Sequence, residues 1–198
     1  RTAISRRPDK LIKEELSEAG EKNQLVPDMV FKSTYFLDML GLPDVFKESD
    51  LEKAIISQME AFLMELGTDF AFLARQKRIP VDNVDYHLDL LFFHRELKRM
   101  VAIDLKIGKF KPEYEGQMRL YLRYLDKKER KAGEESPIGL ILCSEGNTEH
   151  IEYLMLDENN PVKVAQYYTK LPDKKVLALQ MRKAIETAKA LATDASGE

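Results

Sequence analysis

The sequence predicts an α/β protein, because short apolar runs of strand length alternate along it with longer segments of helical periodicity. Residues 88–93 and 138–143 are the longest apolar runs, and their length suits buried strands. Residues 49–67 and 113–131 instead repeat apolar side chains every three or four positions, as one face of a helix does. This alternation favours a mixed central sheet flanked by helices.

The first elements are expected to be helical. Residues 34–42 form an apolar patch that ends in glycine and proline, which predicts a short helix packed on the domain. Ser49 and Asp50 are residue types that cap helix N-termini, and an amphipathic helix follows them until Gly67 stops it.

Three strands are expected next, over residues 70–79, 86–94 and 98–107, and the second and third of them plausibly form a hairpin. A break after residue 107 precedes the long helix over 113–131.

The last part of the chain predicts further strands and a closing helix. Residues 138–143 are small and branched apolar residues, typical of a buried central strand. Residues 149–156 suggest another strand, and residues 162–168 an edge strand or a short connection. Residues 173–192 predict a terminal helix.

Composition excludes several classes of protein. The chain has 198 residues, enough for one sizeable core, and 44% of them are hydrophobic, which argues against wholesale disorder. Its apolar runs are far shorter than the roughly 20 residues that span a bilayer, so no membrane association is expected. Cys143 is the only cysteine, which excludes an internal disulfide and a four-thiolate zinc site and favours a reducing, cytoplasmic location.

Charge is distributed unevenly along the chain. The formal net charge is −3, but residues 98–131 contain eleven basic and five acidic side chains. A basic stretch inside an acidic chain is consistent with local phosphate binding. A solvated helix face of mixed charge explains the same pattern, and charge alone does not separate these two interpretations.

A possible site lies on the two strands of the expected hairpin. Side chains alternate along a strand, so Asp104 and Lys106 share one face while Ile103 and Leu105 occupy the other. Asp89 interrupts the apolar run of the preceding strand, and a hairpin would bring its carboxylate towards Asp104.

This combination suits a particular chemistry. Two carboxylates and a backbone carbonyl are oxygen ligands for Mg²⁺ or Mn²⁺, and a lysine beside them can orient water or stabilise charge on a phosphate. The pattern therefore indicates metal-dependent phosphodiester hydrolysis. In the alternative interpretation, Asp89 caps a turn and Asp104 simply pairs with Lys106 at the surface.

These positions also carry a resemblance. A helix with Glu60, then Asp89, then residues 104–106, then a helix with Gln117 resembles the PD-(D/E)XK (restriction-endonuclease-like) superfamily. The chain more narrowly resembles the YhcG-like nuclease family from about Pro27 to near Pro172. The segments that carry this similarity are residues 62–67, 89–94, 106–108, 110–114, 116–118 and 137–143.

The resemblance implies a metal site formed by Asp89, Asp104 and the carbonyl of Leu105. It implies that Lys106 is the catalytic lysine, as expected from its place beside the carboxylates. The commoner residue at the position of Asp104 is Glu, so the metal would lie about one methylene closer to the strand.

Two further roles follow from the resemblance. Glu60 would hold metal-bound water, although an ordinary solvated glutamate fits its position too. Gln117 would face the site from its helix, and a plain surface glutamine is the competing interpretation. We expect Lys109, Lys111 and Arg119 to guide a nucleic-acid backbone.

Taken together, the sequence predicts a Mg²⁺- or Mn²⁺-dependent endonuclease that hydrolyses DNA. Residues 49–192 would form the nuclease domain, 1–48 a peripheral lead-in and 193–198 a frayed tail. The chain starts with Arg1 rather than Met, and the resemblance implies an additional N-terminal helical domain, so we expect that missing domain or a partner protein to supply targeting. A homodimer is possible. The alternative is an inactive module that binds nucleic acid or protein within a DNA-processing or defence complex.

Overall fold

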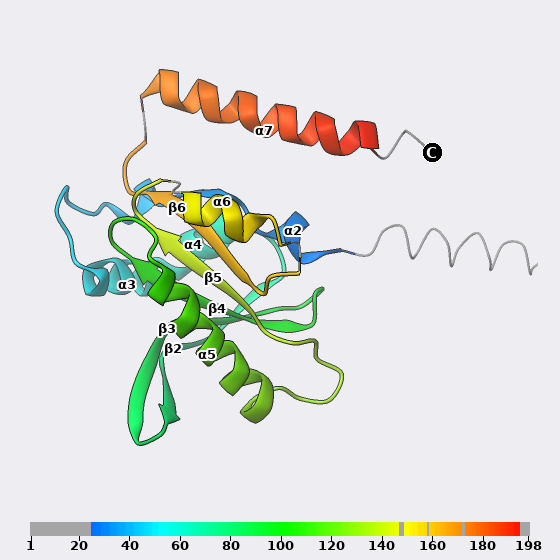
Figure 1. Cartoon of the computed structure of the whole chain (residues 1–198). Helices are drawn as coiled ribbons and strands as arrows, with labels where there is room; N and C mark the ends of the chain where they lie inside the picture. The colour runs from blue at the N-terminus through cyan, green and yellow to red at the C-terminus, as the bar shows by residue number, and fades with distance from the viewer. Residues whose placement is uncertain (1–24, 147–148, 158, 172, 195–198) are drawn as a thin grey trace, which may run out of the picture.

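The computed structural model describes residues 25–146, 149–157, 159–171 and 173–194, apart from several side chains towards the C-terminal end. The chain forms a six-stranded sheet. Figure 1 shows helices on both faces of this sheet, and the arrangement confirms the predicted α/β class and the mixed sheet. The strand order is β1-β6-β5-β4-β3-β2. Neighbours from β1 to β4 run parallel, whereas β3 is antiparallel to both β4 and β2.

The elements follow the chain in a simple order. Their bounds are α2 (Pro27–Val30), β1 (Thr34–Phe36), the 3₁₀ turn η1 (Asp38–Leu40), α3 (Glu48–Ser57), α4 (Met59–Leu66), β2 (Phe70–Val81), β3 (Val84–His94), β4 (Arg99–Lys106), α5 (Pro112–Lys128), β5 (Ile138–Cys143), α6 (Glu149–Met155), β6 (Val162–Tyr168) and α7 (Lys174–Asp194). The expected strands at β2, β3, β4 and β5 and the helices at α5 and α7 are confirmed within a few residues.

Helices α3 and α4 cover one face of the sheet, and α5 and α6 cover the other. The first face packs Leu51, Ile55 and Phe62 against alternate residues of β3 and β4. The second packs the stripe of α5 that includes Met118 and Tyr121 on the opposite side of the same strands. Burying both faces explains why β5 is apolar along its whole length.

Residues 34–42, expected as a helix, form β1 and η1 instead, so this prediction is wrong. Tyr35 and Leu37 are fully buried with the half-buried Phe36 between them, an alternation that suits a strand. β1 pairs with β6, so the sheet includes residues from within the expected lead-in 1–48. Strand β6 is accordingly an interior strand, flanked by β5 and β1, rather than an edge or a connection.

Two more expectations need correction. Residues 149–156, expected as a strand, are mostly the helix α6, because Ile151 is buried and Leu154 half-buried at a spacing of three, while Tyr153 between them is exposed. The helix expected over residues 49–67 is divided at Gln58, whose backbone leaves the helical conformation.

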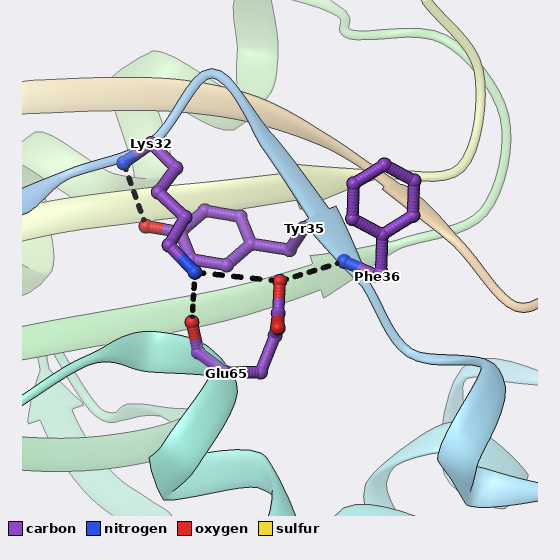
Figure 2. Close-up of polar contacts among 4 residues, drawn as sticks. All are labelled: Lys32, Tyr35, Phe36 and Glu65. Atoms are coloured by element: carbon purple, nitrogen blue, oxygen red, sulfur yellow. Dashed lines mark hydrogen bonds and ion pairs between the residues drawn. The ribbon is translucent and has the colours of Figure 1, made fainter. Parts of the chain in front are cut away.

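Glu65 attaches the short edge strand β1 to α4 (Figure 2). Its carboxylate accepts a hydrogen bond from the Phe36 backbone N–H at 2.9 Å and lies 3.5 Å from Lys32 Nζ. The same Nζ donates to the Glu65 carbonyl at 2.6 Å. The Tyr35 hydroxyl accepts from the Lys32 N–H, and burial raises the pKa of Tyr35 to about 12. These contacts hold α4, and with it one wall of the core, against the sheet.

Most of the expected frayed tail, residues 193–198, lies outside the described residues. Residues 193 and 194 are described, and they are the last two residues of α7. No helix in the described part of the chain is both long enough and apolar enough to cross a membrane.

Alanine substitutions at two glycines test how closely α5 packs on β5. A Cβ at Gly139 would lie 2.5 Å from Met118 Cγ, whereas a Cβ at Gly116 in α5 meets nothing within 4 Å. We expect Gly139→Ala to lower the free energy of unfolding by about 1–3 kcal/mol through overpacking. Gly116→Ala, the control, is expected to raise it by up to about 1 kcal/mol through helix propensity. Urea denaturation measures both, and equal effects would contradict this packing.

Candidate active site

The site forms where β3 and β4 stop pairing. Their ladder runs from His94 opposite Arg99 to Leu90 opposite Ile103, and the next position in this register places Asp89 opposite Asp104. There the Leu105 backbone N–H donates to Asp89 Oδ2 at 2.8 Å. The Asp89 side chain thus accepts the hydrogen bond of a backbone N–H that has lost its partner strand. This bond keeps the Asp89 carboxylate close to Asp104.

Asp104 is a carboxyl buried beside a second carboxyl. Only 2% of the Asp104 surface is exposed to solvent. Burial, followed by repulsion from Asp89, raises the pKa of Asp104 to about 7, against the opposing attraction of Lys106. Lys106 Nζ lies 3.1 Å from Asp104 Oδ2, yet this oxygen has no aligned hydrogen-bond partner. We attribute the contact to charge attraction, so the oxygen keeps lone pairs available to a cation.

Lys106 remains a cation in this setting. Burial acts to lower its pKa, but attraction by Asp104, Glu48 and Asp89 outweighs burial and raises the pKa. The Nζ also lies 4.9 Å from the centre of the Tyr114 ring, a favourable cation–π arrangement. The charged amine is therefore fixed between Asp104 and α5, and it is unsuited to accept a proton near neutral pH.

Helix α5 closes the site on one side. Tyr114 contacts Lys106, and burial, then Asp104 and Asp89, raise the pKa of Tyr121, which places both tyrosines near the carboxylates. Gln117 is half-buried and lies three residues after Tyr114 and four before Tyr121, on the same side of the helix. The structure therefore places Gln117 on the face of α5 that borders the site.

Among the acidic residues of the first core helices, Glu52 of α3 and not Glu60 of α4 is linked to Asp89 through a shared hydrogen-bond donor. Glu60 is exposed on α4, and among the described residues no hydrogen bond or ion pair links it to Asp89, Asp104 or Lys106. Glu52 is 8% exposed, and its Oε2 accepts a hydrogen bond from Gln76 Nε2 at 2.5 Å. The same nitrogen donates to Asp89 Oδ1 at 3.0 Å.

Sequence reasoning missed both Glu52 and Gln76. The available signal was a glutamate directly beside the buried Leu51 of the amphipathic helix. Glu48, at the start of α3, was missed as well: it accepts a hydrogen bond from the Ile107 N–H at 3.2 Å and attracts Lys106.

The expected backbone-binding cations divide into two groups. Lys109 and Lys111 are exposed in the loop between Lys106 and α5, and Lys111 Nζ lies 6.0 Å from the Tyr114 ring centre. Arg119 is engaged elsewhere, because it donates to Glu115 at 2.9 Å and to Asn160 at 3.0 Å. The lysines border the site, whereas Arg119 links α5 to the segment before β6.

The donor set fits a hard divalent cation. Two acidic side chains face each other, one of their oxygens lacks a hydrogen-bond partner, and burial makes their joint negative charge costly. The described part of the chain contains no group of three or more acidic, histidine or cysteine side chains arranged to hold a metal. The protein would thus supply two carboxylates, with backbone oxygen and water completing the ligand set.

The raised pKa of Asp104 predicts a pH-dependent stability. Its folded value of about 7 exceeds the unfolded value near 3.8, so the folded state holds this proton more tightly. Stability should therefore fall as the pH rises from about 4 to about 7. Asp104→Asn removes this loss, and we expect its stability relative to wild type to increase over that range by a few kcal/mol, at about 1.4 kcal/mol per pH unit.

Urea denaturation of both proteins at pH 4, 6 and 8, without divalent ions, measures this change. Only the pH dependence is the readout, since the lost ion pair with Lys106 adds an offset. Asp89→Asn serves as a control, because it removes one cause of the raised pKa and should flatten the dependence. A stability difference that stays constant from pH 4 to pH 8 would contradict the assignment.

Comparison with known proteins places this chain in a family. Residues 28–184 match the model of the YhcG PDDEXK nuclease domain. The chain is 39% identical over 160 residues to a protein of Escherichia coli (strain K12) named "Putative nuclease YhcG", an alignment that covers 81% of this chain and 43% of that protein. The chain therefore spans less than half of this relative.

A solved structure is also similar in part. The crystal structure of a repair endonuclease from Pyrococcus abyssi superposes with a TM-score of 0.44 at 16% identity, covering 65% of this chain and 50% of the other. The family match spans most of the chain, including both carboxylates and Lys106, and agrees with the resemblance carried by the sequence. The chain belongs to the YhcG PDDEXK nuclease domain family.

Proposed function

We propose that this domain hydrolyses DNA phosphodiester bonds with the help of Mg²⁺ or Mn²⁺. The observation that carries the proposal is the pair formed by Asp89 and the buried Asp104, with the charged Lys106 at 3.1 Å. The similarity to a nuclease family supports the same chemistry.

Asp89, Asp104 and the Leu105 carbonyl would hold the divalent ion. When bound, the ion would polarise the scissile phosphate and favour ionisation of a water molecule. Lys106 stays protonated, so its role is to attract a phosphate oxygen and to stabilise the negative charge that develops there. Gln117 can orient water or a phosphate oxygen from α5.

We assign to Glu52 the part expected for Glu60, which is to hold water at the metal site. Glu52 is connected to Asp89 through one shared amide group, whereas Glu60 has no recorded contact with the site within the described residues. Lys109 and Lys111 would bind phosphates on either side of the cleaved bond, since both are exposed next to Lys106.

The first test is cleavage by the purified chain. With Mn²⁺ or Mg²⁺, we expect cleavage of duplex, single-stranded or branched DNA, and a loss of about 10²–10³-fold in rate for Lys106→Ala and for Asp104→Asn. A matched set of RNA substrates establishes whether the sugar matters. The proposal fails if no DNA is cleaved with either ion, or if Lys106→Ala cleaves DNA as fast as wild type.

An inactive nucleic-acid-binding module is the alternative. It would bind DNA without cleaving it under any of these conditions.

The second test concerns backbone binding. We expect Lys109→Ala and Lys111→Ala to weaken DNA binding at every sequence and to reduce the slope of log affinity against log salt by about one each. Arg119→Ala should change this slope less, because its guanidinium is already bound to Glu115 and Asn160.

Fluorescence anisotropy at several salt concentrations, in the Lys106→Ala background to prevent cleavage, gives these slopes. If Arg119→Ala lowers the salt slope more than either lysine variant does, then Arg119 rather than the two lysines binds the DNA backbone.

A further inference from the structure

The exposed side-chain amide of Gln76 connects Asp89 of β3 to Glu52 of α3. Gln76 stands opposite Asp89 in the β2–β3 register, since Arg75 pairs with Leu90 and Lys77 with Leu88. Its single Nε2 atom donates to Asp89 Oδ1 at 3.0 Å and to Glu52 Oε2 at 2.5 Å. An amide nitrogen has two protons, so these two bonds use its full donor capacity.

The backbone at Gln76 is unusual for a strand. Its φ is +44°, in the left-handed region that residues other than glycine rarely adopt. Neighbouring side chains on a regular strand point to opposite faces, yet Arg75 and Gln76 both reach Glu52, with Arg75 Nε at 3.7 Å from Oε1. The positive φ therefore turns Gln76 towards the site.

Such strain persists where the surroundings over-determine it, and it concentrates at functional positions. Gln76 is exposed, so its two hydrogen bonds add little to the buried core. Asp89 now has both oxygens fixed, Oδ2 by the Leu105 N–H and Oδ1 by Gln76. Each oxygen retains a further lone pair that can reach a cation.

We propose that Gln76 is a positioning residue that fixes the Asp89 and Glu52 carboxylates for divalent-cation binding, an inference that rests on the proposed function. Gln76 contacts neither the cation nor the substrate in this role. It acts by holding Asp89 in one orientation and by keeping two acidic side chains at a constant separation.

Calorimetric titration with Mn²⁺ tests this role without any substrate. We expect Gln76→Ala to weaken Mn²⁺ binding by about 10–100-fold, the usual effect of removing a partner of a metal ligand. In cleavage assays the same variant should need proportionally more Mn²⁺ to reach its maximal rate, with an unchanged KM for DNA.

Two variants separate positioning from backbone strain and from general damage. Asn tolerates the left-handed conformation and keeps an amide, but its shorter side chain does not span both carboxylates, so Gln76→Asn should also weaken Mn²⁺ binding. Gln58→Ala removes a side-chain amide that donates to the Leu40 carbonyl at 3.4 Å, away from the two carboxylates, and it should leave Mn²⁺ binding unchanged. Thermal denaturation without divalent ions identifies any variant that fails to fold.

The bridge that Gln76 forms between Asp89 and Glu52 can also be followed by NMR. The Gln76 side-chain amide resonances should shift in both Asp89→Asn and Glu52→Gln, and they should stay unchanged in Glu60→Gln, a matched replacement outside the bridge.

Each outcome is decisive. If wild type binds and cleaves with Mn²⁺ while Gln76→Ala or Gln76→Asn binds Mn²⁺ within twofold of wild type, the positioning role is overturned and the proposed function stands. If wild type binds neither Mn²⁺ nor Mg²⁺ and cleaves no DNA with either ion, both are overturned.

Discussion

The separation of β3 from β4 is the constraint on which the site depends. While two strands remain paired, their backbones bond to each other and their side chains lie on fixed faces. Just beyond Leu90 the ladder ends, and Asp89 takes the Leu105 N–H that a backbone carbonyl would otherwise satisfy. The same hydrogen bond holds Asp89 beside Asp104, so the end of the ladder and the clustering of negative charge have one cause.

The two faces of the sheet contribute differently to this arrangement. On one face, α3 and α4 supply apolar packing, and α3 brings Glu48 to the end of β4 and Glu52 to Gln76 of β2. On the other, α5 supplies two tyrosines, one against Lys106 and one near the carboxylates. Charged groups are thus held from both sides by elements whose main contacts are apolar, which limits how far the carboxylates can move apart.

Residues that depend on regular geometry were predictable from the sequence, and residues that depend on local exceptions were not. Alternation along β4 correctly places Asp104 and Lys106 together on one face and Leu105 on the other. Gln76 was missed because a positive φ interrupts that alternation. Glutamine is not a residue type that indicates a positive φ, so nothing in the sequence pointed to it. Glu52 was missed for a related reason, since its link to Asp89 runs through Gln76. The catalytic and metal-binding roles assigned to all these residues stay predictions.

Cys143 closes β5 and is 1% exposed, and burial raises the pKa of its thiol to about 12. A thiol in this state is almost entirely protonated at neutral pH and is shielded from reagents, so it reacts slowly with maleimides and oxidants. Because the chain contains no other cysteine, a single cysteine introduced at an exposed position would carry a spectroscopic label at one defined place. The native sequence therefore already provides the background that distance measurements by spin or fluorescent probes require.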